Sequence, residues 1–408
     1  MRGLRRILVP LAGILGAGLT QGQELAHSEV ERGRYLATAA NCAGCHTDIE
    51  NDGVPFTGGR ALETPFGIIY SKNLTPDDET GLGQWSRDEF YRAMTEGVGR
   101  EGEQLYPAFP YPYFTLMPRQ DVDAVYAYLR TLEPVQVEIP ENELPFPFNI
   151  REAVLGWKLL HFEQGEFVLD PTQTEAWNRG KYLVDGPAHC GACHTGKNLV
   201  GGDEKQQYLR GGVLENWFAP NIRGGDNGGI AHWEIENIVA FLGDGRSRHT
   251  APMQRMGEVV ELSTQHLAAA DLEAIAIYLK SLDDEQGDRP SPASDARLAA
   301  GRAIYFDNCA ACHDASGTGV PYIYAPLAGS NKVTADEPSA AIRIILGGAQ
   351  AVPTEAAPGP IAMPAFDWKL DDEQVADLVT YLRQSWGNNA SEISAGMVAD
   401  MRAYLEEH

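Results

Sequence analysis

The chain has 408 residues, of which 43% are hydrophobic, enough for two to four domains with ordinary cores. Its 32 Lys and Arg residues are outnumbered by 57 Asp and Glu residues, so the formal net charge is −25 at pH 7. A surface that binds nucleic acid needs clustered Lys and Arg. The charge therefore argues against a nucleic-acid partner and favours solubility and steering toward basic partners.

Residues 1–22 have the pattern of a secretory signal peptide. A basic start with Arg2, Arg5 and Arg6 precedes an apolar run from Ile7 to Leu19, and small residues follow. The run is short and rich in glycine for a membrane-spanning helix. We expect the segment to be removed on export, which places the mature chain in the periplasm. In that oxidising compartment unpaired cysteines are unusual unless they are chemically capped.

Every cysteine belongs to one of three copies of a C-x-x-C-H motif. The copies are Asn41-Cys42-Ala43-Gly44-Cys45-His46, His189-Cys190-Gly191-Ala192-Cys193-His194 and Asn308-Cys309-Ala310-Ala311-Cys312-His313. This is the attachment signature of c-type haem, in which two thiols one helical turn apart bond the porphyrin and the adjacent histidine faces the iron. A zinc site or a redox dithiol needs no histidine directly after the second cysteine. We therefore predict three covalent haem c groups with iron, one at each motif.

Short helical segments open and close each part of the chain that carries a motif. The opening segments are Glu31-Arg32-Gly33-Arg34-Tyr35-Leu36, Asn178-Arg179-Gly180-Lys181-Tyr182-Leu183 and, more loosely, Gly301-Arg302-Ala303-Ile304-Tyr305. The closing segments, with apolar residues at helical spacing and a final Tyr-Leu, are 121–129, 271–279 and 374–382. An opening glycine and a closing tyrosine suit two helices that cross closely. The segments mark internal repeats of roughly a hundred residues.

The middle segments of the first two repeats also resemble each other. Asn73-Leu74 and Asn221-Ile222 are each followed by a glycine-rich run that ends in tryptophan, at Trp85 and Trp233. Each run leads into a predicted helix. The third repeat carries Ala325-Pro326-Leu327 and lacks the tryptophan, so it is the divergent copy.

We expect an all-α fold of three tandem class I cytochrome c-like domains with long loops, because no strand-like alternation stands out. The predicted domains are residues 27–135, 171–284 and 297–387. The linker 136–170 is rich in proline and aromatic residues and too hydrophobic to hang free, so we expect it to pack at an interface. Residues 285–296 form a shorter polar linker.

The tail, residues 388–408, has apolar residues at helical spacing together with acidic ones. Two interpretations stay open for it. It could be an amphipathic helix at a membrane surface, or it could dock onto the third domain or a partner.

The ligand on the second face of each iron separates electron transfer from catalysis, because a thioether raises the reduction potential and closes the iron to substrates. In the first domain Met94 lies in a predicted helix and fits core packing, whereas Met117 lies in a loop before the closing helix. Met363 has no rival in the third domain. In the second domain, spacing alone leaves both Met253 and Met256 open.

The histidines outside the motifs are expected to be surface or structural residues rather than iron ligands. His249 is the one to examine, because it precedes the loop that carries Met253.

The chain resembles the triple-haem cytochrome c subunits of membrane-associated bacterial dehydrogenases, such as those acting on alcohol, gluconate and fructose. Beyond the motifs, the resemblance rests on Leu105-Tyr106-Pro107-Ala108-Phe109-Pro110-Tyr111, Phe146-Pro147-Phe148-Asn149-Ile150-Arg151 with Trp157, Trp177-Asn178-Arg179-Gly180-Lys181-Tyr182-Leu183, and Trp217-Phe218-Ala219-Pro220-Asn221. It implies Met256, before a Glu-Val-Val run, as the second haem's ligand. Where the family often has methionine this chain has Phe109, which leaves Met117 for the first haem.

The resemblance also implies a role. Electrons would pass from a catalytic dehydrogenase subunit of flavin, quinone-cofactor or molybdenum type, through the haems, to ubiquinone or another respiratory acceptor. The protein would lie in the periplasm, attached peripherally to the outer face of the cytoplasmic membrane. Two alternatives stay open: an oxidase-linked or free electron shuttle, and a multihaem enzyme such as a peroxidase, which would need a haem without its methionine.

Overall fold

The computed structural model describes residues 17–214, 217–226, 228–285, 290–359 and 361–407. Most of the predicted signal peptide, residues 1–16, lies outside the described residues, as do residues 286–289 of the second predicted linker. Residues 17–22, the end of the predicted signal peptide, are continuous with the first long helix, α1 (Ala17–Ala39).

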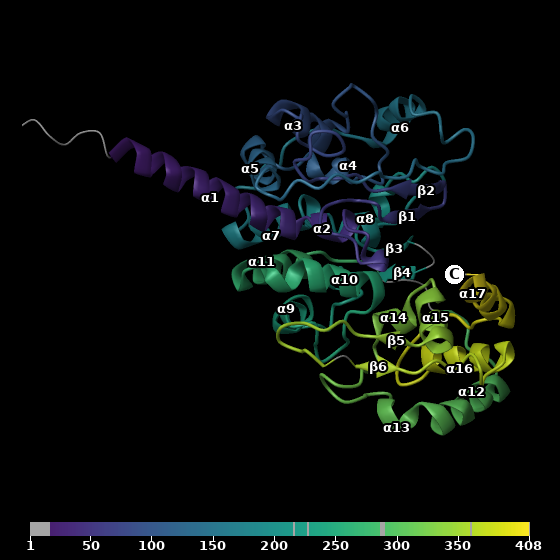
Figure 1. Cartoon of the computed structure of the whole chain (residues 1–408). Helices are drawn as coiled ribbons and strands as arrows, with labels where there is room; N and C mark the ends of the chain where they lie inside the picture. Colours follow the sequence, from purple (N-terminus) through teal and green to yellow (C-terminus); the bar gives the residue numbers. More distant parts are fainter. Residues whose placement is uncertain (1–16, 215–216, 227, 286–289, 360, 408) are drawn as a thin grey trace, which may run out of the picture.

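The described helices form three groups, which follow one another from the top to the lower right of Figure 1 and which we call the first, second and third units. The first unit holds α1, α2 (Cys42–Cys45), α3 (Arg87–Glu96), α4 (Tyr111–Phe114) and α5 (Arg119–Leu129). The second holds α7 (Glu175–Asp185), α8 (Gly191–His194), α9 (Ile235–Gly243), α10 (Gln254–Leu262) and α11 (Ala269–Lys280). The third holds α12 (Asp295–Asn308), α13 (Ala310–His313), α14 (Asn331–Thr334), α15 (Ser339–Gly347), α16 (Asp372–Gln384) and α17 (Ala395–Glu407).

In each unit the opening and closing helices cross at the predicted glycine. The pairs are α1 with α5, α7 with α11, and α12 with α16. A Cβ added to Gly33 would lie 1.8 Å from the carbonyl oxygen of Ala124, and one added to Gly180 would lie 1.9 Å from that of Ala274. At Gly301 the corresponding distance to the oxygen of Asp377 is 2.1 Å. The helices touch backbone to backbone, so no side chain fits at these positions.

Local signals explain where several helices begin and end. Ser86 accepts a hydrogen bond from the backbone of Glu89, and the Glu89 carboxylate accepts one from the backbone N–H of Ser86, which is a capping box at the start of α3. Gly97 ends α3 with φ of 62°, a left-handed conformation that glycine adopts without strain. Asp371 and Gln374 form a second capping box at the start of α16.

Each unit has its own hydrophobic core. The first surrounds Val122 and Phe90, the second Leu183 and Ile275, and the third Val375. Ala39, at the end of α1 in the first unit, belongs to the core of the second unit. The first two units therefore share a packed boundary.

The fold is mainly helical, but the expectation of an all-α class is wrong in one respect. The described residues include three two-stranded antiparallel sheets. Their strands are β1 (Ala61–Thr64) with β2 (Gly67–Tyr70), β3 (Gly211–Leu214) with β4 (Trp217–Pro220), and β5 (Ala349–Gln350) with β6 (Ala362–Met363). Strands of two to four residues are too short to show a period of two in the sequence.

The predicted first linker packs against the first unit and reaches the second. Glu143 exchanges backbone hydrogen bonds with Ile68, and the Lys158 ammonium in α6 (Ala153–His161) donates to carbonyl oxygens at the end of α3. The Trp157 indole N–H donates to the carbonyl oxygen of Val200 in the second unit, 2.9 Å away. The outer face of α6 stays exposed, with Leu159 at 87%.

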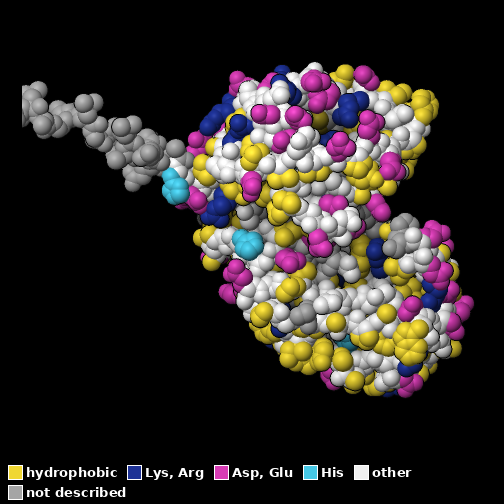
Figure 2. All heavy atoms as spheres, in the orientation of Figure 1, with side chains coloured by type: hydrophobic (Ala, Val, Ile, Leu, Met, Phe, Trp, Pro, Cys, Tyr) yellow, Lys and Arg dark blue, Asp and Glu magenta, His cyan; other side chains and the backbone are white. Residues whose placement is uncertain are grey.

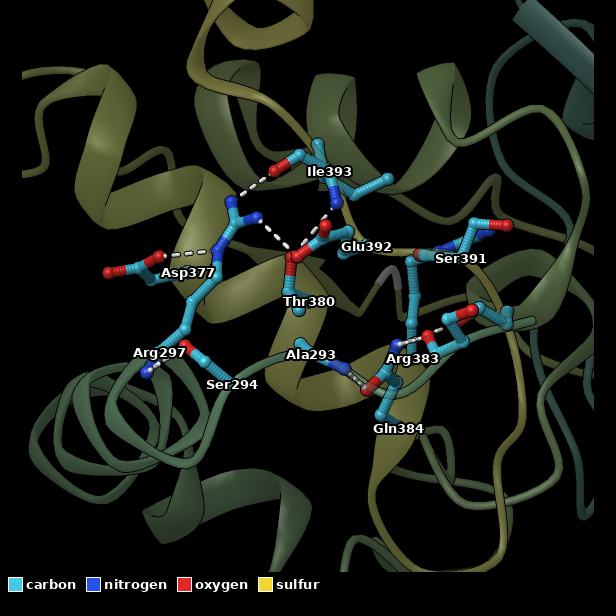
Figure 3. Close-up of polar contacts among 12 residues, drawn as sticks. Ala293, Ser294, Arg297, Asp377, Thr380, Arg383, Gln384, Ser391, Glu392 and Ile393 are labelled. Atoms are coloured by element: carbon cyan, nitrogen blue, oxygen red, sulfur yellow. Dashed lines mark hydrogen bonds and ion pairs between the residues drawn. The ribbon is translucent and has the colours of Figure 1, made fainter.

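The tail folds back onto the third unit. Ile393 and Val398 are almost fully buried in the third core, and α17 packs on α15 and α16. Figure 3 shows how the connection is tied: the guanidinium of Arg297 contacts Asp377, Glu392 and the carbonyl oxygen of Ile393. Of the two open interpretations of the tail, the structure shows docking onto the third unit.

The surface matches the acidic composition. Figure 2 shows Asp and Glu side chains scattered over the visible face, with Lys and Arg among them rather than gathered into one basic surface. None of the described helices combines the length and apolar composition needed to cross a bilayer.

Candidate functional site

Each C-x-x-C-H motif forms a single helical turn, α2, α8 or α13. The turn places the two cysteines on one side with the histidine directly after the second. All six cysteines lie within the described residues, and none is in a disulfide. The first two motifs are partly buried, whereas Cys312 in the third is exposed. The structure thus brings together the cysteines and histidine predicted for each site.

The motif histidines share one hydrogen-bonding arrangement. Nδ1 of His46 lies 2.6 Å from the carbonyl oxygen of Lys72. Nδ1 of His194 lies 2.7 Å from that of Pro220, and Nδ1 of His313 lies 2.8 Å from that of Ala325. Because a carbonyl only accepts, Nδ1 carries the proton and donates, which leaves Nε2 as a free lone pair. A histidine oriented in this way is the ordinary ligand of a metal through Nε2, so the residues present fit a haem iron.

The carbonyl acceptors were missed from the sequence, although a signal for them was present. Strand β2 ends two residues before Lys72, and β4 ends at Pro220, so each hairpin delivers the acceptor to its histidine. The echoed segments of the first two repeats, which begin at Asn73 and Asn221, start one residue after the acceptor, and the divergent segment of the third begins with the acceptor, Ala325. The repeat therefore marked the acceptors, but a backbone carbonyl has no residue type by which to recognise it.

Burial controls the charge of the motif side chains. It lowers the pKa of His46, His194 and His313, against a smaller opposing effect of their carbonyl hydrogen bonds. The imidazoles are therefore neutral at pH 7, the state in which Nε2 can ligate. Burial also raises the pKa of the Cys42 and Cys190 thiols to about 12 and that of the Cys309 thiol to about 11.

The first two motifs are each covered by the other unit. A Cβ added to Gly191 would lie 2.9 Å from the ring of Tyr113, which comes from α4 of the first unit. In the other direction, the buried guanidinium of Arg60 donates to the carbonyl oxygen of Gly44 at 2.5 Å and to Glu258 of α10 at 2.8 Å. The segment that carries Met117 thus packs on the second motif, and the helix that carries Met256 is tied to the first.

The methionines predicted as ligands have different surroundings. Met117 is fully buried in the first core, against which Cys42 packs. Met363 packs against the third core together with Cys309. Met94 is buried core, as predicted. Met256 is partly buried in α10 and is not among the residues of the second core.

A cavity opens beside the third motif, and its walls come from two units. The third unit contributes Cys309, Cys312, His313 and Met363, while the second contributes a loop that includes Thr250 and Met253. Isoleucine, leucine and alanine side chains make up half of the rest of the lining. Met253 therefore shares a cavity with the third motif.

His249, the histidine that precedes the Met253 loop, packs against an aromatic side chain. His249 stacks on Trp233 with ring centroids 4.7 Å apart, and burial, together with His232 and Arg248, lowers its pKa to about 4. Among the described residues, no group of three or more His, Cys, Asp and Glu side chains is arranged to hold a metal ion. A structural zinc site, which needs four such ligands, is not found among them.

The motif helices, the oriented histidines and the helical cores define a cytochrome c. The family model for cytochrome c matches residues 30–133 and 298–386. Covalent haem c with iron is the cofactor of this family.

Comparison with characterised proteins narrows the class further. The chain is 36% identical to the gluconate 2-dehydrogenase cytochrome c subunit of Pantoea cypripedii, over 98% of this chain and 95% of that protein. It is 36% identical to the fructose dehydrogenase cytochrome subunit of Gluconobacter japonicus, over 92% and 82%. It is 34% identical to the cytochrome c subunit of the quinone alcohol dehydrogenase of Gluconobacter oxydans, over 94% and 84%. The chain belongs to this family of dehydrogenase cytochrome c subunits, and its role is electron transfer.

Proposed function

We propose that the chain carries three haem c groups and passes electrons from a catalytic dehydrogenase subunit to a respiratory acceptor. One observation supports this most strongly: the same arrangement of two thiols and a histidine, with Nδ1 donating to a backbone carbonyl, occurs in all three units. In this proposal the thiols are Cys42 and Cys45, Cys190 and Cys193, and Cys309 and Cys312.

A bound haem c supplies an iron that cycles between the ferric and ferrous states, one electron at a time. The protein's own residues hold and tune that group. The thioether cysteines fix its position, and the carbonyl of Lys72, Pro220 or Ala325 fixes the orientation of the ligating imidazole. The surrounding apolar cores exclude water and lower the local dielectric constant.

Methionine thioethers are proposed as the second ligands: Met117, Met256 and Met363. Met117 lies in the core against which Cys42 packs, and Met363 packs against the same core as Cys309, which supports the first and third assignments. In the second unit, Met253 lines the cavity of the third motif, which supports Met256 over Met253 as the proposed ligand. Three closed irons favour electron transfer over a peroxidase-like activity.

The relatives support a catalytic subunit as the electron donor. Each is the cytochrome subunit of a dehydrogenase, so the donor here is proposed to be a catalytic subunit of flavin, quinone-cofactor or molybdenum type. The acceptor is proposed to be ubiquinone or another respiratory carrier. The amino-terminal segment supports a periplasmic site, attached peripherally to the outer face of the cytoplasmic membrane.

Affinity capture from gently solubilised membranes of the native host tests the partner. We expect mass spectrometry to find a large catalytic dehydrogenase subunit, and addition of its substrate to reduce the haems. Recovery of the cytochrome alone, or with oxidase subunits, would favour a free or oxidase-linked shuttle. High-spin ferric haem with turnover in the absence of any partner would favour a multihaem enzyme.

A further inference from the structure

The cavity at the third motif contains a partly buried cation whose role the attachment of haem does not explain. Lys332, in the short helix α14, lines this cavity. Its ammonium group hydrogen-bonds the Thr250 hydroxyl of the second unit, 3.3 Å away. Burial alone lowers the pKa of Lys332 to about 8, and no carboxylate contributes. The described lining of the cavity contains no Asp or Glu.

The backbone next to Lys332 is fixed by hydrogen bonds from a buried arginine. The guanidinium of Arg383, only 1% exposed, donates to the carbonyl oxygens of Val333 at 2.8 Å and Ala335 at 2.6 Å. Its Nε donates to the carbonyl oxygen of Ser391, a contact drawn in Figure 3. Arg383 thus ties α14 to α16 and to the segment before α17. The lysine is therefore anchored at a fixed place in the cavity wall.

A second cation reaches the same cavity from the second unit. Arg246 lines it, and one of its terminal nitrogens donates to the carbonyl oxygen of Gly359. The Ser247 and Thr250 hydroxyls of the same loop donate to the carbonyl oxygens of Thr250 and Ala251, which leaves the two cations as the charged groups of the lining.

An ammonium group in an apolar cavity is costly unless an opposite charge accompanies it. The chain supplies none to Lys332 among its described residues, so the occupant of the cavity must. Cys309, Cys312 and His313 line the same space, and the group they bind under the proposed function carries two propionate carboxylates. A carboxylate paired with the Lys332 ammonium supplies the opposite charge that this end of the cavity lacks.

We infer that Lys332 binds a propionate carboxylate of the haem at the third motif, and that Arg246 completes this carboxylate site from the second unit. The inference rests on the proposed haem at His313. It makes the third haem site a shared property of two units. It also gives Lys332 control of the reduction potential, because a nearby positive charge favours the reduced, less positive haem.

The test is a spectroelectrochemical titration of the full-length, haem-loaded protein. Lys332→Met keeps the length of the side chain and removes its charge. We expect the affinity of one haem for its electron to fall about tenfold, which corresponds to about 59 mV for a one-electron couple, with the other two unchanged. Lys332→Arg should keep the potential near the native value. Lys332→Gln is a second neutral variant, should the methionine not be tolerated.

Arg302→Gln is the matched control. Arg302 is an exposed cation of the third unit that lies over the ring of Phe306 and does not line the cavity. Its loss removes the same charge but should leave all three potentials in place. Equal shifts in the Arg302 and Lys332 variants, or no shift in either neutral Lys332 variant, would overturn the inference.

Peptide mapping of the native protein separates failure of the inference from failure of the proposed function. If the peptide of Cys309 and Cys312 carries haem and the neutral variants do not shift a potential, only the inference fails. If that peptide carries no haem, the proposed third site fails and the inference fails with it.

Discussion

The first and second units exchange hydrogen bonds between tyrosine and carboxylate side chains, whereas the third unit meets the second through other contacts. Arg343 lies over the Trp217 ring, and the Thr354 hydroxyl donates to the carbonyl oxygen of Asp244, 2.6 Å away. Tyr35 of the first unit donates to Asp271 of the second at 2.6 Å, and Tyr182 of the second donates to Asp121 of the first. Each carboxylate also binds the arginine that precedes the crossing glycine in its own unit. At the matching positions the third unit has Ala303 and Gln374, so this exchange is confined to the first pair.

The same difference is seen at the motifs. α2 and α8 are each covered by a segment of the other unit, whereas in α13 both Ala311 and Cys312 are exposed. Figure 2 shows hydrophobic side chains gathered at the lower end of the molecule, where the third unit lies. The comparison teaches that each of the first two motifs is covered by a segment of the other unit, while the third motif meets the second unit across a cavity.

Loss of one attachment site gives the largest expected effect. Cys309→Ser with Cys312→Ser should remove the third haem and leave the other two, because α13 is covered by neither of the first two units. Cys42→Ser with Cys45→Ser should also lower haem content at the second motif, since Arg60 ties the first motif to α10. Mass spectrometry of the peptides measures the haem content at each motif in both double variants. Equal, single losses in both variants would argue against a jointly built pair.

Substitution at a helix crossing should have the next largest effect. Gly180→Ala forces a Cβ to within 1.9 Å of the Ala274 carbonyl oxygen, and overpacking of this kind costs about 1–3 kcal/mol. Calorimetry of the haem-loaded protein should show a lower melting temperature for the joined first and second units. Gly156→Ala in α6 is the control: its Cβ meets nothing within 4 Å, so the helix should gain about 0.5–1 kcal/mol. Similar outcomes for the two variants would contradict the crossing geometry.

Removal of one tyrosine hydroxyl that donates across the boundary of the first two units should have a smaller effect on stability. Tyr182→Phe leaves the Asp121 carboxylate, a residue only 2% exposed, without one of its donors, at a cost of about 1–3 kcal/mol. Chemical denaturation measures this loss as a decrease in the free energy of unfolding. Tyr70→Phe is the matched control, because its hydroxyl binds Glu143 in an exposed contact and should cost less than about 0.5 kcal/mol. If both variants cost the same, the exchange does not stabilise the pair.

The smallest expected effect is a change with pH. Burial raises the pKa of Asp271, but hydrogen bonds from Arg179 and Tyr35 and the charge of Arg179 outweigh it, so the net pKa lies below the ordinary value. The carboxylate therefore stabilises the fold above its unfolded pKa of about 3.9, and this contribution is lost as pH falls through the lower folded pKa. Unfolding free energies between pH 5 and 3 should fall less steeply in Asp271→Asn. Parallel curves would exclude this carboxylate as a source of acid sensitivity.

Local patterns allowed much of the fold to be predicted. The closing helices and the crossing at Gly33, Gly180 and Gly301 follow from helical spacing and from the backbone contact that only glycine permits. The hairpins were missed because strands of four residues or fewer show no reliable period. The exchange of Tyr35 and Tyr182 was missed because it joins residues more than sixty positions apart, and no local pattern reports such a contact.

The candidate site also has features that local sequence patterns predict and features that they do not. The thiols and histidines were predicted because their chemistry requires fixed residue types at fixed spacing. The carbonyl partners and Lys332 were not, because their roles depend on where the folded chain places them. The choice between Met253 and Met256 lay beyond spacing for the same reason, since the side chain of Met253 belongs to the cavity of a different unit.

Mass mapping of the mature protein after proteolysis tests the central proposal most directly. Covalent haem c remains on its peptide through denaturation, so each attachment site can be read separately. The account predicts one haem on each of the three peptides that contain Cys42 and Cys45, Cys190 and Cys193, and Cys309 and Cys312. A peptide recovered with both thiols free, from protein matured in its native host, would contradict it.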